Sequence, residues 1–147
     1  MLQESFDYID NADLNNLAQK KDTQILILSS NELQDTASVI LFYREVTGRH
    51  YMNDNWNSLD EALHDCGWMD QKNVWIIHKG GLPRIDKNNL KIYLNILLES
   101  MKLHKVGPNG KFILPQRKID FHVAFVVEGE DEKLKLQQQI NEVLNLP

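Results

Sequence analysis

Three short apolar runs divide the chain and predict its strands. Each run is nearly continuous in apolar residues and rich in β-branched or aromatic side chains. Runs of this kind are typical of strands in parallel sheets, which are buried on both faces. The three predicted strands are 24–28, 74–77 and 121–127.

Helical periodicity fills the intervals between these runs. Apolar residues recur at spacings of three and four, which predicts amphipathic helices that pack one face on a core. The S-x-x-E pattern from Ser29 to Glu32 is expected to cap the first of these helices, and Gly48 to end it. The predicted helices cover 33–46, 55–66, 90–104 and 131–146.

The order of these elements is strand, helix, helix, strand, helix, strand, helix. Strands that alternate with helices favour an α/β fold with a small parallel three-stranded sheet and helices packed on it. Residues 1–23 are mostly polar, and the short piece Phe6–Ile9 within them could pack or add a strand. Residues 11–21 are expected to be a loop or a weak helical turn, and residues 106–118 a long loop.

The stretch from Asn55 to Trp68 has the most unusual charge pattern in the chain. No lysine or arginine lies between Arg49 and Lys72. Five acids lie in that window: Asp54, Asp60, Glu61, Asp65 and Asp70. Because solvated helices usually mix charges, one explanation is a surface for a basic partner. The other is a solvated acidic face, which is the more common origin of a charge run.

Composition limits the classes of function. With 147 residues, of which 42% are hydrophobic and 25% charged, the chain can form one domain with a core. The net charge of −5 disfavours direct binding of nucleic acid, which needs a basic surface. No apolar run is long enough to span a membrane. The polar start Met1–Glu4 and the single cysteine, Cys66, predict a cytoplasmic protein without an intrachain disulfide.

Candidate chemistry is sparse. Cys66 falls on the apolar side of its helix, where a buried structural side chain is far more common than a catalytic thiolate. Asp60 and His64, four residues apart, supply two ligands of a metal site that needs three or four. Both His78 and His122 lie in or beside strands and are expected to be structural. We therefore predict no catalytic residue, no metal and no cofactor.

The acidic stretch resembles the motif of a known family. The residues that carry the resemblance are Tyr51, the run Asn55-Trp56-Asn57-Ser58-Leu59-Asp60-Glu61-Ala62-Leu63, the pair Gly67-Trp68, and the strand Val74–Ile77. Together they are similar to the barstar-like family of intracellular ribonuclease inhibitors. The resemblance implies a barstar-like domain over 24–127, an N-terminal extension over 1–23, and a C-terminal helix over 128–147 packed on the domain.

In function, the resemblance implies an inhibitor or immunity protein whose second helix blocks the active site of a ribonuclease toxin. A ribonuclease holds phosphate with cationic side chains, and carboxylates on a rigid helix can occupy the same positions. The partner would be a basic protein, and the chain would have no enzymatic activity. The expected partner-binding residues are Tyr51, Asn53, Asn55, Asn57, Asp60, Glu61, His64, Trp68 and Glu99.

Several positions depart from the family motif. Asn53 stands at its glycine and Asn57 at its first aspartate, while Glu61 replaces its central aspartate with a longer acid. These differences leave a second hypothesis open, an adaptor of the same fold that binds a different basic protein or toxin. A third hypothesis is a metal-dependent enzyme built on Asp60 and His64.

Overall fold

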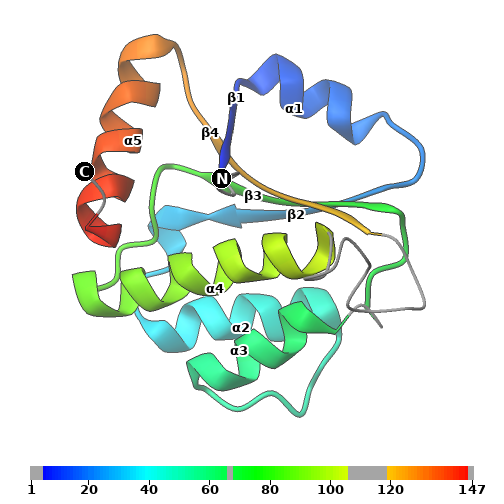
Figure 1. Cartoon of the computed structure of the whole chain (residues 1–147). Helices are drawn as coiled ribbons and strands as arrows, with labels where there is room; N and C mark the ends of the chain where they lie inside the picture. The colour runs from blue at the N-terminus through cyan, green and yellow to red at the C-terminus, as the bar shows by residue number, and fades with distance from the viewer. Residues whose placement is uncertain (1–4, 66–67, 106–118, 146–147) are drawn as a thin grey trace.

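The computed structural model describes residues 5–65, 68–105 and 119–145, and a parallel β-sheet lies at its centre (Figure 1). Its strands are β1 (Asp7–Ile9), β2 (Thr23–Ser29), β3 (Asn73–Lys79) and β4 (Asp120–Val126). They lie in the order β1-β4-β3-β2, and every neighbouring pair is parallel. The α/β class and the parallel sheet are confirmed. The expected count of three strands is wrong, because residues 7–9 pair with β4 as a fourth strand.

Helices pack on both faces of this sheet (Figure 1). On one face lie α2 (Thr36–Thr47), α3 (Trp56–His64) and α4 (Lys87–Lys105), and α5 (Glu130–Leu144) packs beside α4. The other face carries α1 (Asn11–Ala18). The chain crosses the sheet in one direction from β2 through β3 to β4, and in the opposite direction from β1 to β2. Right-handed crossovers therefore place α1 on the face opposite α2, α3 and α4.

Two apolar cores result, one on each face of the sheet. Along β4, Phe121, Val123 and Phe125 face the main core, which the larger helices complete. Ala124 faces the other way and belongs to a smaller core with Leu14, Leu17 and Ile77. Because both faces of the central strands are buried, their sequences read as continuous apolar runs rather than as alternation.

Helix α2 begins later than the sequence pattern predicts. Residues Ser30–Glu32 form a 3₁₀ turn, and Ser29 makes no side-chain cap. The N-cap of α2 is instead Asp35, whose carboxylate accepts a 2.7 Å hydrogen bond from the backbone N–H of Ser38. Ser30 is fully buried, and its hydroxyl donates to the carbonyl of Gly81 at 2.6 Å. The serine thus joins the ends of β2 and β3 instead of capping a helix.

The end of α2 agrees with the sequence pattern, whereas the segment before β2 does not. Gly48 ends α2 in the left-handed conformation, with φ of 70°, as expected. Residues 11–21 were expected to lack a full helix, but Asp10 caps α1 through a reciprocal capping box with Asp13. No helix in the described part of the chain is long and apolar enough to cross a membrane. Three predicted features lie outside the described residues: Cys66, Gly67 and the 106–118 loop.

A chain of hydrogen bonds crosses the main core. The hydroxyls of Tyr43 and Tyr93 are 2.7 Å apart, and the Tyr93 hydroxyl is 2.7 Å from Nε2 of His78. Nδ1 of His78 lies 3.2 Å from the carbonyl of Ala124. Because a carbonyl only accepts, Nδ1 carries the proton, Nε2 accepts from Tyr93, and Tyr93 accepts from Tyr43. His78 is therefore structural, as expected, and its complete burial lowers its pKa to about 4.

This network predicts that the protein loses stability as the pH falls from about 6.5 to about 4. In the unfolded chain His78 takes up a proton near pH 6.5, whereas in the folded protein it does so only near pH 4. The unfolded state therefore binds more protons in this window. The neutral state of His78 contributes about 3 kcal/mol to the free energy of unfolding. This contribution is complete above about pH 6.5 and lost below about pH 4. Urea unfolding at a series of pH values measures it.

The matched variants are His78→Gln and His50→Gln. His78→Gln removes the buried titrating group, so its free energy of unfolding should vary less with pH than that of the wild type. His50 is exposed, and its variant is the control for the loss of a histidine as such. An unchanged pH dependence in His78→Gln would show that another group is responsible.

Candidate functional site

Helix α3 is fixed at its N-terminus by side chains of its own loop. Asn55 is the N-cap, and its side-chain oxygen accepts a 2.9 Å hydrogen bond from the backbone N–H of Ser58. The Ser58 hydroxyl in turn accepts from the backbone N–H of Asn53 at 3.2 Å. These bonds join residues 53–55 to the first turn, and the bond from Ser58 satisfies one of the amide groups that a helix start leaves free.

The inner side of α3 packs on the core and on α4. Nε1 of Trp56 donates to the side-chain oxygen of Asn89 at 2.8 Å, and the Trp56 ring lies 5.8 Å from that of Tyr93. Asn89 is itself held by Asp86. The fully or nearly fully buried residues of α3 are Leu59, Ala62 and Leu63. The helix therefore has one fixed rotation about its axis.

The C-terminus of α3 is held by three donors. The carbonyls of residues 61, 62 and 63 accept from the backbone N–H of Asp65 (3.1 Å), Nε1 of Trp68 (2.6 Å) and Nε2 of His104 (2.6 Å). The last two donors come from outside the helix. Burial lowers the pKa of His104, which favours the neutral ring. The end of α3 can thus sit against the core with its carbonyls satisfied.

The outward side of α3 presents two acids that no lysine or arginine neutralises within the described residues, and Glu61 is the more exposed of them. The carboxylate of Glu61 is exposed, and no hydrogen bond or ion pair holds it within the described residues. Asn57, one turn earlier, is exposed as well. Asp60 lies at the margin, with Oδ1 3.2 Å from Nε2 of His64, and its side chain is 39% exposed. Neither Asp60 nor Glu61 is paired with a lysine or arginine in the described structure.

Two further acids of the stretch are neutralised by arginines. Asp54 forms a 2.6 Å ion pair with Arg44 of α2, and Asp65 is paired with Nη2 of Arg49. The other terminal nitrogen of Arg49 donates to the hydroxyl of Tyr51. The sequence between Arg49 and Lys72 contains no lysine or arginine, but Arg49 at its edge and Arg44 of α2 form ion pairs with its acids. The free negative charge of α3 is therefore narrower than the sequence indicates and centres on Glu61, while Asp70 is exposed beyond the helix.

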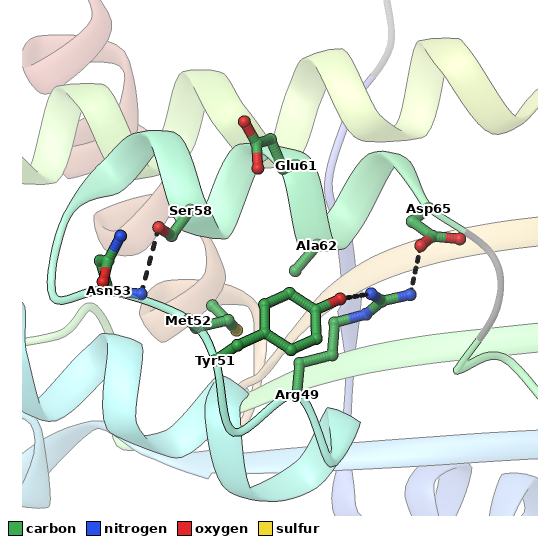
Figure 2. Close-up of a pocket in the computed structure, with 8 residues that line it drawn as sticks. All are labelled: Arg49, Tyr51, Met52, Asn53, Ser58, Glu61, Ala62 and Asp65. Carbon is green, nitrogen blue, oxygen red and sulfur yellow. Dashed lines mark hydrogen bonds and ion pairs between the residues drawn. The ribbon is translucent and has the colours of Figure 1, made fainter.

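A pocket of about 250 Å³ lies between α3 and the preceding loop (Figure 2). Within it, Arg49 bridges Tyr51 and Asp65, and the Glu61 carboxylate points away from this bridge. Its lining residues are Arg49, Tyr51, Met52, Asn53, Ser58, Glu61, Ala62 and Asp65. The pocket is polar and carries both signs of charge, so it suits a polar or ionic group of a partner rather than an apolar one.

Most of the predicted partner-binding residues lie on this surface. The exposed members around the loop and α3 are Tyr51, Asn53, Asn55, Asn57 and Glu61. Asp60 and His64 are partly buried beside them. Trp68 is only 7% exposed and supports the helix from beneath. Glu99 is exposed on α4, the helix that packs beside α3.

Sequence reasoning missed the residues that position the helix. Asn89 and His104 hold α3 from α4, and neither stands in a recognisable motif. In the sequence Arg49 marks only the limit of the acidic window, and nothing there indicates its bond to Asp65. Within the described residues, no group of three or more His, Cys, Asp or Glu side chains is arranged to hold a metal ion, so Asp60 and His64 stay a pair.

No protein-family model matches this chain, and neither the curated proteins nor the solved structures give a significant match.

The N-cap geometry predicts different effects for two neighbouring asparagines. Replacing Asn55 by alanine removes the acceptor for the Ser58 amide and should lower the free energy of unfolding by about 1 kcal/mol. Asn57 is exposed and makes no side-chain hydrogen bond within the described structure, so Asn57→Ala should change stability by less than about 0.5 kcal/mol. Urea unfolding of both variants measures the difference. Equal losses would mean that Asn55 does not act as the cap.

Proposed function

We propose that this chain is a barstar-like inhibitor, an immunity protein that binds and blocks the active site of a cytotoxic ribonuclease in the cytoplasm. One observation carries the proposal: a helix held at both ends presents an exposed carboxylate, Glu61, with no internal counterion in the described structure. A ribonuclease active site contains lysine, arginine or histidine to hold phosphate. A fixed carboxylate at the phosphate position would meet those cations.

The rigidity of α3 supports this proposal energetically. Association costs free energy whenever side chains or loops must become ordered. Here the loop is already bonded to the first turn, and the last turn is bonded to Trp68 and His104. The acidic face would therefore bind without rearrangement of the helix.

The neutral residues around Glu61 support a protein partner rather than a free cation. Tyr51 is 73% exposed, although tyrosine is amphipathic and frequent at the centre of protein interfaces. Asn53 and Asn57 add exposed amide groups that can both donate and accept. A surface with one aromatic side chain, two amides and a central acid has the composition of a small recognition site.

The charge of Glu61 should dominate the affinity. Glu61→Gln keeps the size of the side chain but removes its charge, and should weaken binding on the order of 100-fold, because losing one member of a desolvated charge pair costs about 2–5 kcal/mol. The partner to use is a purified ribonuclease toxin whose activity the wild-type chain inhibits, with the dissociation constant measured by calorimetry. Glu45→Gln is the matched control, since Glu45 is an exposed glutamate on the neighbouring helix α2.

A result against this proposal is easily recognised. If Glu61→Ala and Asp60→Ala both inhibit the ribonuclease as well as the wild type, this face is not the binding site. If Glu45→Gln weakens binding as much as Glu61→Gln, the effect reflects overall charge and not the α3 surface.

Ionic strength should act mainly on the association rate. Complementary charges steer an encounter, and salt screens them over about 8–10 Å at physiological concentration. The wild-type association rate constant should therefore fall steeply as salt rises, and that of Glu61→Gln should fall less. Stopped-flow fluorescence at several salt concentrations measures both slopes. Equal slopes would show that Glu61 does not contribute to steering.

A second candidate function is an adaptor of the same fold that binds a different basic protein or toxin. The observation that favours it is Arg49, a cation that lines the pocket beside Glu61. Arg49 is paired with Asp65, and this pair of opposite charges beside Glu61 suits a partner that carries both signs of charge better than a purely cationic site. Arg49→Gln separates the two functions, because it should strengthen binding to a purely cationic site and weaken binding to a mixed one.

A further inference from the structure

The two edges of the sheet are built differently. Strand β1 has three residues and includes the charged Asp7, whereas β2 has seven residues, TQILILS, with no charge, proline or glycine. Edge strands are usually short, charged or covered, because their free N–H and C=O groups can pair with another chain. Strand β1 follows this rule and β2 does not.

The outer backbone groups of β2 are open in the described structure. In a parallel ladder, alternate residues direct their N–H and C=O groups to the neighbouring strand, and the others point outward. Strand β2 pairs with β3 on one side, and no other backbone hydrogen bond reaches residues 23–29 from the described residues. The side chain of Gln24 forms hydrogen bonds with the backbone of Trp68 and Asp70, and the backbone of β2 takes no part in these bonds.

The side chains of β2 leave an apolar margin beside this open edge. Leu26 and Leu28 point into the main core and are buried. Ile25 and Ile27 point to the opposite face, where α1 covers the smaller core. Ile25 is partly buried, and Ile27 remains 42% exposed. The apolar surface thus adjoins the unpaired backbone, as it does in strands that accept another strand.

We propose that β2 pairs in antiparallel fashion with β2 of a second copy of this chain, about a two-fold axis at Leu26. The sequence of the strand is nearly self-complementary about that residue. Thr23 would face Ser29 and Ile25 would face Ile27 of the other copy, and the one unmatched pair would be Gln24 with Leu28. In this register, odd-numbered residues face odd-numbered residues, and even-numbered residues face even-numbered ones. The residues whose backbone N–H and C=O groups point outward therefore lie opposite each other, whether they are the odd or the even set. Two parallel sheets would thereby form one continuous sheet.

A second copy fits this edge better than an unrelated strand. A two-fold interface uses the same surface twice, so it requires self-complementarity, which the order of residues in β2 provides. Each Ile27 would meet a β-branched residue of the other copy, a favourable cross-strand pair. The strand carries no charge, so two copies of this acidic chain can approach here without direct repulsion. This inference does not depend on the proposed function of α3.

Sedimentation velocity over about 5–200 µM protein tests the proposal, because self-association depends on concentration. The wild type should shift from monomer to dimer across this range. Ile27→Lys should remain monomeric, since the lysines of the two copies would face isoleucines at the centre of the interface. Ile92→Lys is the matched control: Ile92 is 43% exposed on α4, and its variant should dimerise like the wild type.

A monomeric wild type at every concentration would overturn the proposal, and so would an Ile27→Lys protein that dimerises normally. Hydrogen exchange of the wild type provides a test that does not depend on any variant. Amides within residues 23–29 should exchange more slowly at high than at low concentration. Dimerisation without added protection there would place the interface elsewhere and overturn the assignment to β2.

Discussion

The termination of α3 is the constraint on which the candidate site depends. A helix leaves its last carbonyls without internal partners, and a nine-residue helix is not stable alone in water. In this protein Trp68 and His104 donate to two of those carbonyls, and the backbone of Asp65 donates to a third. The helix can therefore end against the core at a fixed position. The direction of the Glu61 side chain follows from that position.

The electrostatics of the site follow from its tertiary contacts. Arg44 and Arg49 neutralise Asp54 and Asp65, so the acids at the two ends of α3 contribute little free charge. Pairs of this kind on a surface contribute about 0–1 kcal/mol to stability, and here they also define where charge remains. On α3 itself the remaining acids are Glu61 and, at the margin beside His64, Asp60, while Asp70 lies exposed beyond the helix without an ion pair in the described structure. A partner would therefore meet a localised charge surrounded by neutral polar groups.

Much of the fold was predictable because the buried face of a strand or helix appears in the sequence as a local pattern of apolar residues. The strands β2, β3 and β4 and the helices α2, α4 and α5 were recognised from apolar runs and helical periodicity. Strand β1 cannot be assigned from the pattern alone, since three residues are too few to show a period. Helix α1 was underestimated because its capping box at Asp10 is built from aspartates, whereas the pattern from Ser29 to Glu32 looked like a box and is not one.

The site itself was predictable only in part. The exposed face of α3 follows from the spacing of its residues, and Glu61 lies on it as expected. The sequence does not show that Trp68 lies beneath the helix, because an aromatic residue beside acids is equally suited to a core and to an interface. The supporting contacts of Asn89 and His104 join residues 33 and 41 positions apart. No local pattern records such pairs, so only the folded chain reveals them.

Competition for the active site tests the central claim most directly. If α3 places a carboxylate where a ribonuclease binds phosphate, the chain and a non-cleavable oligonucleotide cannot bind the enzyme together. The apparent dissociation constant of the chain should then rise in proportion to the oligonucleotide concentration. An apparent constant that stays the same at saturating oligonucleotide would contradict this account.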